Sequence, residues 1–155
     1  MRVFARLEHL LAEMEMGKKL RINRDFVPCP VLEGDERFAN GIFEFNITRM
    51  VEYIRARPSE FIPEEITVDD FKRFEPFDDS KLEGIEIGEP VIIAEIAPGK
   101  YNLIDGNHRM EKALKLGMKS ILAYRVTVNQ HMKFMTERKA YEIYVKYWNG
   151  KLKEN

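Results

Sequence analysis

The stretch that decides the fold reads Tyr101-Asn-Leu-Ile-Asp-Gly-Asn-His-Arg109. Its first residues, Tyr101 to Ile104, form a short apolar segment typical of a β-strand, and the Asp-Gly pair that follows is a common turn dipeptide. From residue 107 onward apolar residues recur at helical spacing, and Gly117 stands where a glycine commonly ends a helix. The sequence therefore predicts a strand, a tight turn and a helix over residues 107–116.

The start of this predicted helix is suited to bind an anion. The first turn of a helix has backbone N–H groups without helical partners, and the helix dipole adds positive potential there. His108 and Arg109 add further positive charge, which is unfavourable at this end of a helix unless an anion is bound. We therefore expect a phosphate-binding site at residues 105–109. The alternative is an ordinary turn in which Asp105 or Asn107 caps the helix and His108 has no function.

The flanking segments predict the sheet to which this strand belongs. Pro90 to Ile96 is an apolar strand, and Pro98-Gly99 turns the chain back into Tyr101 to Ile104 as a hairpin. Ile121 to Val126 is the next predicted strand. We expect a small mixed sheet built around the hairpin 90–104 and the strand 121–126, with the helix 107–116 crossing between them.

Three further helices are predicted to flank this sheet, which makes the fold class α/β. Residues 3–16 and 47–57 have amphipathic spacing, and Asn46 precedes the second of these helices as an N-cap. Residues 20–24 are a candidate short strand. Residues 129–148 form the predicted C-terminal helix, ended by Gly150. Its apolar stripe is expected to pack against the sheet or against a second protomer in a homodimer, and consists of Phe134, Tyr141, Val145 and Trp148.

The composition is that of a soluble globular protein, with 45% hydrophobic and 33% charged residues. A chain of 155 residues favours a single domain, residues 1–155. No apolar stretch approaches the roughly 18 residues that a membrane-spanning helix needs, so no membrane association is expected. Cys29 is the only cysteine, which excludes an intramolecular disulfide and fits a reducing, cytoplasmic setting. The net charge of −1 argues against non-specific binding of duplex DNA, which needs clustered lysines and arginines.

A second segment is a candidate for one wall of the binding site. In the stretch Asn40-Gly-Ile-Phe-Glu-Phe-Asn-Ile-Thr-Arg49, the polar residues Glu44 and Arg49 are candidates to line the pocket. The alternative is a strand or loop that leads into a capped helix. The acidic residues 78–86 form either a loop near the pocket or a solvated surface loop.

The central segment resembles the signature of the ParB/sulfiredoxin superfamily. The resemblance rests on Asp105-Gly-Asn-His-Arg109, a helix of about ten residues, Gly117, and the strand Ile121-Leu-Ala-Tyr-Arg-Val126. In that superfamily a hairpin strand ends in a Gly-x-x-Arg motif at the N-terminus of a helix, which leads to a glycine and another strand. The resemblance covers residues 90–127, about a quarter of the chain, and implies a single ParB/sulfiredoxin-like domain.

This resemblance implies a phosphate pocket. The superfamily includes CTP-binding chromosome-partition proteins, ATP-using sulfiredoxins, free-serine kinases and nuclease-like proteins. Carried over to this chain, the residues that would bind phosphate or a nucleotide are Gly106, Asn107, His108 and Arg109, with the arginine able to bind bidentately. Asp105 matches an aspartate of the kinase-like members, where it would hold a metal ion or act as a base. Asp105 and His108 are therefore the expected catalytic residues.

The chain departs from two branches of the superfamily. Sulfiredoxins carry their catalytic cysteine just before the His-Arg pair, where this chain has Asn107, which argues against sulfinic-acid reduction by that mechanism. The clamp-type partition proteins carry Glu-Arg or Arg-Arg in place of Asn107-His108. They also need a long DNA-binding domain downstream, for which this chain is expected to be too short.

Two classes of function follow. The first is a nucleotide-dependent phosphotransferase or phosphohydrolase that binds ATP, ADP or CTP with Mg²⁺, or a phosphorylated small molecule. The alternative is a ParB-like nucleic-acid-binding protein or nuclease, in which the same pocket contacts a backbone phosphate. The near-neutral charge of the chain favours the first class. A third class, a binding module without catalysis, needs the same pocket.

Overall fold

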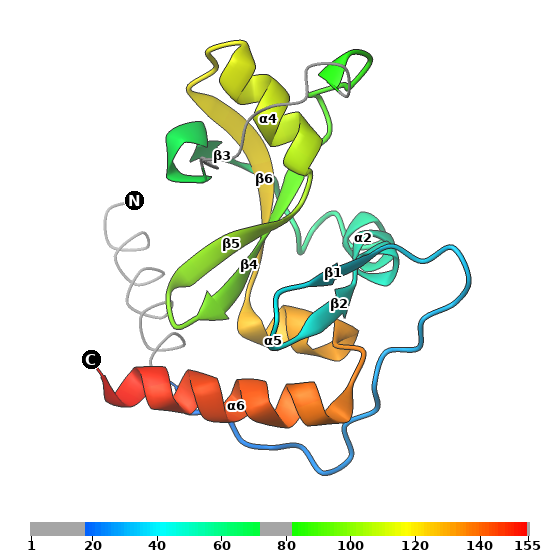
Figure 1. Ribbon diagram of the computed structural model, residues 1–155, viewed down its shortest axis with the longest axis vertical. Helices are drawn as coiled ribbons and strands as arrows, with labels where there is room; N and C mark the ends of the chain where they lie inside the picture. Colours follow the sequence, from blue (N-terminus) through cyan, green and yellow to red (C-terminus); the bar gives the residue numbers. More distant parts are fainter. Residues whose placement is uncertain (1–17, 72–81, 155) are drawn as a thin grey trace.

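The computed structural model describes residues 18–71 and 82–154 of the chain. It contains helices and strands in alternation, which confirms the α/β class (Figure 1). None of the helices in these two ranges has the length and apolar character that crossing a membrane requires. In chain order the elements are β1 (Arg37–Ala39), β2 (Glu44–Asn46), α2 (Ile47–Arg55), β3 (Glu64–Thr67), the 3₁₀ helix η1 (Val68–Phe71), β4 (Val91–Ala97), β5 (Lys100–Asp105), α4 (Asn107–Lys115), β6 (Ser120–Val126), α5 (Val128–His131), the 3₁₀ helix η2 (Met132–Phe134) and α6 (Arg138–Lys153).

The main sheet is mixed, as predicted. Its strand order is β3-β6-β4-β5; β4 and β6 run parallel, and the other two pairs are antiparallel. The predicted hairpin is β4–β5, and α4 connects β5 to β6 in the same sheet. Strands β1 and β2 form a separate antiparallel pair, with Phe38 opposite Phe45.

Both faces of the main sheet are covered, so there are two cores. On one face, Ile92, Ala94 and Val126 pack with residues of α2, α5 and α6; we call this the α6 core. On the other face, Val91 and Ile93 pack with Met110 and Ala113 of α4; we call this the α4 core. Neighbouring residues of a strand point to opposite faces, and this explains why the start of β4 is a continuous apolar run. Figure 1 shows α4 and α6 at opposite ends of the sheet.

The helix predicted at residues 129–148 is divided into α5, η2 and α6. Between them Met135 is extended, its carbonyl accepts a hydrogen bond from the Cys29 N–H at 2.8 Å, and it forms an isolated bridge with Phe45. These long-range backbone contacts prevail over the helical periodicity of the segment. Gly150, predicted to end the helix, lies inside α6. The predicted apolar stripe is nevertheless buried against the α6 core of the same chain.

Predictions for the remaining helices and strands have different outcomes. The helix predicted at 47–57 is α2, and the side-chain oxygen of Asn46 caps it by accepting the Arg49 N–H at 3.1 Å. The strand considered at residues 20–24 is absent from the described segment, because both backbone groups of Leu20 bond the side chain of Asn149 on α6 instead. The helix predicted at 3–16 lies outside the described residues.

A buried polar cluster joins the sheet to α5 and α6. The carboxylate of Glu95 on β4 accepts the backbone N–H groups of Gly99 at 3.0 Å and Val128 at 3.1 Å. The carbonyl oxygen of Glu95 accepts the Tyr144 hydroxyl at 2.8 Å and lies 2.5 Å from Nε2 of His131. Burial lowers the pKa of His131 to about 4, so its ring is neutral at neutral pH.

Stability is therefore expected to fall as the pH drops from about 6.5 toward 4. In this range the unfolded chain protonates His131 and the folded chain does not, which lowers the free energy of unfolding by about 2 kcal/mol between pH 7 and pH 5. Urea denaturation at the two pH values measures the loss. The His131→Gln variant cannot titrate there and is the control, because the carboxylates contribute equally to both proteins. Equal losses in the two proteins would refute the prediction.

Candidate functional site

Gly106 sets the geometry where β5 turns into α4. It has φ 97° and ψ 29°, in the left-handed region, and a Cβ atom there would lie 2.5 Å from Cγ1 of Val91. Only glycine meets both conditions without strain. Gly106 itself is the N-cap of α4 and supplies no side-chain cap. The alternative in which Asp105 or Asn107 caps this helix is therefore wrong, and no side chain of residues 18–71 or 82–154 caps the first-turn N–H groups, which leaves them to a ligand.

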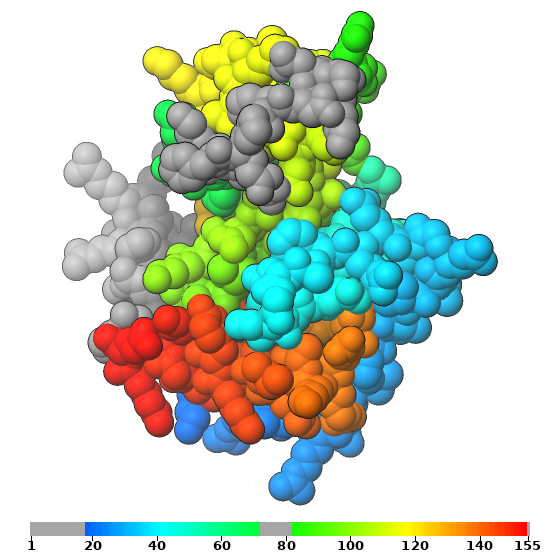
Figure 2. All heavy atoms as spheres, in the orientation of Figure 1, coloured from blue at the N-terminus to red at the C-terminus, as the bar shows by residue number. Residues whose placement is uncertain are grey.

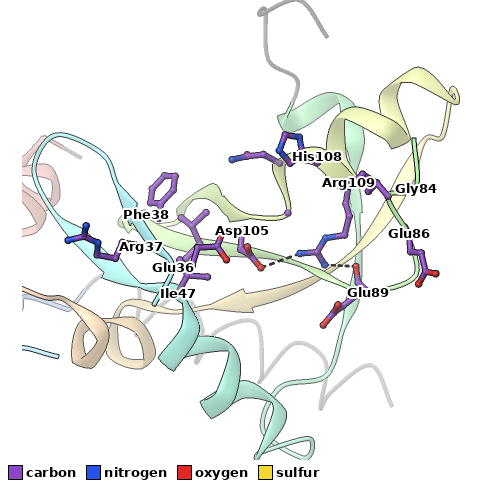
Figure 3. Close-up of a pocket in the computed structure, with 14 residues that line it drawn as sticks. Glu36, Arg37, Phe38, Ile47, Gly84, Glu86, Glu89, Asp105, His108 and Arg109 are labelled. Carbon is purple, nitrogen blue, oxygen red and sulfur yellow. Dashed lines mark hydrogen bonds and ion pairs between the residues drawn. The ribbon is translucent and has the colours of Figure 1, made fainter. Parts of the chain in front are cut away.

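A cleft of about 500 Å³, which we call the main cleft, opens at the N-terminus of α4 (Figure 3). It brings together all five residues predicted for the phosphate site, at positions 105–109. Its other walls come from three distant segments, namely residues 36–38 with Ile47, residues 84–86, and Glu89. Figure 2 shows the segment of β1 and β2, in cyan, lying against the green β4–β5 hairpin.

A β-bulge at the end of β5 sets the direction of Asp105. Ile93 pairs with Leu103 but Ile92 pairs with Asp105, so Ile104 is an extra residue on β5. Bulges of this kind redirect side chains next to functional sites. The Asp105 side chain is 17% exposed, and its Oδ2 accepts a hydrogen bond from Arg109 at 3.2 Å. Its second carboxylate oxygen makes no hydrogen bond to another described residue.

Arg109 lines the main cleft, but its guanidinium is already engaged. Nη1 donates to the carbonyl oxygen of Glu89 at 2.9 Å and Nη2 donates to Asp105 (Figure 3). Nη1 also donates to the carbonyl oxygen of Pro90 at 2.8 Å. The side chain is only 15% exposed. Arg109 therefore fixes the segment before β4 against the start of α4. Bidentate binding of a phosphate, as expected from the sequence, would require some of these bonds to be given up.

His108 and Asn107 are freer than Arg109. The His108 side chain is 54% exposed, and its Nδ1 lies 3.6 Å from Glu111. Oδ1 of Asn107 is buried in the cleft lining and has no hydrogen-bond partner among the described residues. His108 and the N–H groups of the first turn are the groups at this helix end that can donate to an anion, whereas Oδ1 of Asn107 is an acceptor and would need a donor on the ligand.

Two of the carboxylates that line the cleft, Glu36 and Glu89, were not predicted from the sequence. Glu36, Glu86 and Glu89 join Asp105 there, opposed by Arg37 and Arg109. Glu89 forms an ion pair with Arg55, whereas the carboxylates of Glu36 and Glu86 have no ion-pair partner in the described part of the chain. Glu86 belongs to the acidic stretch that was considered as a loop near the pocket. Glu36 carries no sequence signal, because backbone hydrogen bonds to Ile47 and Thr48 at the start of α2 bring it to the cleft.

Glu44 and Arg49, the residues predicted to form one wall, lie outside the main cleft. The Glu44 carboxylate accepts the Thr136 hydroxyl at 2.8 Å and lies 3.7 Å from Arg37. Arg49 pairs with Glu52 at 3.0 Å and with Asp35 at 3.5 Å. Of the predicted segment 40–49, Ile47 lines the cleft, and the rest of this wall comes from β1 and from Glu36 just before it.

No protein-made metal cage is present in the described ranges, where no three His, Cys, Asp or Glu side chains gather to hold an ion. Searches against models of protein families and against curated proteins give no match to this chain. Membership of the ParB/sulfiredoxin superfamily therefore stays a prediction from the residues at 90–127.

The Gly106→Ala variant is expected to be destabilised more than a matched variant at the other end of α4. Gly117 also has a positive φ, 72°, but a Cβ atom there meets nothing within 4 Å. In both variants the left-handed backbone conformation costs about 1–2 kcal/mol. Only in Gly106→Ala does the new Cβ atom also collide with Val91. Chemical denaturation measures the difference, and in a double-mutant cycle Val91→Ala should cost less stability in the Gly106→Ala background than in the wild type. Equal destabilisation at both glycines would contradict the close packing.

Proposed function

We propose that the main cleft binds the phosphate groups of a nucleotide or of a phosphorylated small molecule. We further propose that the protein is a ParB/sulfiredoxin-like phosphotransferase or phosphohydrolase. The observation that carries the proposal is the open N-terminus of α4, where Gly106 has no side chain and the helix begins inside a cleft of about 500 Å³. Backbone N–H groups and the helix dipole favour an anion at this position.

One side chain at this helix end supplies a further donor. His108 is exposed in the cleft and can donate to a phosphate oxygen. Arg37 also lines the cleft, but its Nη1 lies 3.7 Å from the Glu44 carboxylate, and Figure 3 shows its side chain pointing away from His108. The phosphate contacts are therefore assigned to the first turn of α4 and His108, with Arg109 as a positioning residue that holds the residues before β4.

The acidic residues of the cleft favour a nucleotide that carries Mg²⁺. Four carboxylates face two arginines, and this balance repels a bare polyphosphate. Mg²⁺ is usually bound by one or two carboxylates together with substrate phosphates and water, rather than by a complete protein cage. Asp105 and Glu36 are the residues that would hold it. Bound there, the ion would neutralise charge on the phosphates.

Asp105 is the preferred candidate for the catalytic base. One of its oxygens bonds Arg109 and is thereby oriented, and the other remains for a proton or the metal ion. In a transfer of the γ-phosphoryl group, the oxygen of the attacking hydroxyl or water would bond to the γ-phosphorus while its proton passes to the Asp105 carboxylate. The bond from the γ-phosphorus to the bridging oxygen would break, and the nucleoside diphosphate would leave with that oxygen.

Binding of nucleic acid, the alternative function, has less support. Proteins bind the phosphate backbone chiefly through lysines and arginines. The main cleft instead carries Glu36, Glu86 and Glu89 on the walls that a polyanion would have to pass.

The proposal predicts that ATP or CTP raises the melting temperature only when Mg²⁺ is present. A ligand at 100 times its dissociation constant adds about 2.7 kcal/mol to the free energy of unfolding. The His108→Ala variant should bind nucleotide about tenfold more weakly, since hydrogen bonds to charged groups contribute about 1.5–3 kcal/mol. Leu116→Ala, an exposed position past the far end of the same helix, is the control. Arg109→Ala is unsuitable, because it also removes three structural hydrogen bonds.

Stabilisation by single-stranded DNA but by none of the nucleotides would favour the alternative function. Absence of stabilisation by any nucleotide, with or without Mg²⁺, would overturn the proposal.

Asp105→Asn is expected to abolish turnover while leaving the fold intact. The amide oxygen can still accept the hydrogen bond from Arg109, but charge and basicity are lost, so the rate should fall about 10²–10⁴-fold with little change in melting temperature. Phosphate release and transfer assays measure the rate, with Glu36→Gln as the companion variant. Full activity in Asp105→Asn together with loss in Glu36→Gln would move the catalytic role to Glu36.

A further inference from the structure

A smaller cavity of about 220 Å³, which we call the side cavity, adjoins the main cleft. The two share the lining residues Glu36, Glu89, Asp105 and Arg109. The ion pair between Asp105 and Arg109 thus contributes to the walls of both compartments. A ligand that occupies the main cleft therefore lies next to the side cavity.

The chemistry of the side cavity differs from that of the main cleft. Its own walls are apolar side chains of α2 and β4, with Ile54 only 3% exposed and Ile92 only 2% exposed. Val51 and Pro90 add to this apolar lining, and the partly buried Tyr124 adds an aromatic ring. Arg55 and Arg109 are the charged donors of its lining, and both guanidiniums are already bonded within the protein. A phosphate would therefore gain little there for the hydration it loses, whereas an uncharged ring would gain by leaving water.

Of the charged residues that line the side cavity, Arg55 is the one that does not also line the main cleft. It is exposed, lies on α2 and forms an ion pair with Glu89, one of the shared residues. These side chains offer one donor group and one acceptor group beside the apolar walls. Most ligand sites have this arrangement, with apolar walls for contact area and a few polar groups for orientation.

We propose that the side cavity receives the base of a nucleotide whose phosphates lie at the N-terminus of α4. This inference rests on the proposed function and adds to it where the uncharged part of the ligand binds. Its volume is suited to a ring and not to a whole nucleotide. Arg109 and Asp105 then stand at the junction of the two compartments, and the apolar walls make Val51 and Tyr124 determinants of specificity.

The segment between the compartments is held from two sides. Arg109 bonds the carbonyl oxygens of Glu89 and Pro90, and Arg55 bonds the Glu89 carboxylate. Because this segment is fixed, both compartments keep their shape, and the base and the phosphates are bound at a set separation.

Calorimetry with two probes tests the inference, namely ATP and inorganic tripolyphosphate, each with Mg²⁺. Tripolyphosphate carries the phosphates without the nucleoside. The wild-type protein is expected to bind ATP at least tenfold more tightly than tripolyphosphate. In Val51→Phe, which fills the side cavity, ATP should bind only as tightly as tripolyphosphate does, and tripolyphosphate affinity should not change. Val27→Phe, the same substitution at an exposed site, is the matched control.

Tyr124→Leu is the second variant if Val51→Phe fails to fold. It removes the aromatic wall and should weaken ATP severalfold without affecting tripolyphosphate. Equal affinity of the wild type for both probes would overturn this inference while leaving the phosphate site standing. So would variants that leave ATP binding unchanged or weaken both probes alike. Binding of neither probe would instead overturn the proposed function, and this inference with it.

Discussion

The close approach of Gly106 to Val91 is the constraint on which the rest of the site depends. A residue with a side chain at this position would displace β4 from the start of α4, because its Cβ would lie 2.5 Å from Val91. Val91 is fully buried in the α4 core, so it has no room to move away. The contact therefore fixes where α4 begins relative to the sheet. Its first turn then opens into the main cleft, and residues 105–109 converge there.

Arg109 belongs to a recognisable motif, but its role in the structure is to hold neighbouring segments together, which the sequence did not predict. From the sequence, an arginine at the start of a helix is expected to bind an anion. In the structure its donors are already used by the carbonyl oxygens of Glu89 and Pro90 and by the Asp105 carboxylate. These bonds also reduce the conflict between the arginine and the helix dipole, since Asp105 supplies a negative charge at the same end. An anion is thus not required to explain this arginine, and the case for a phosphate site rests on the open helix turn and the cleft.

Local sequence signals predicted the parts of the fold that local interactions determine. The β4–β5 hairpin, α4 with its glycines at both ends, and α2 with its Asn46 cap all have a turn or cap signature within a few residues. The failures arose where distant backbone groups prevail: Met135 breaks the predicted C-terminal helix because it bonds Cys29. Glu36 was missed for the same reason, since its backbone hydrogen bonds to Ile47 and Thr48 bring it to the cleft. Asp105, Asn107 and His108 could be chosen as site residues because they are contiguous with the helix start.

The two compartments have different chemistry because successive residues of β4 face different cores. Val91 points to the α4 core and contacts Gly106, where the helix end makes the main cleft polar. Ile92 points to the α6 core and lines the side cavity with Ile54 of α2. Without a bulge, the face to which one residue of β4 points cannot be changed unless the register of the whole strand shifts. The bulge at Ile104 places Asp105 opposite Ile92, so one carboxylate reaches the border of both compartments. A ligand that filled both in the way proposed would place its charged end at the start of α4 and an uncharged ring beside Ile92, as a nucleotide can and inorganic phosphate cannot.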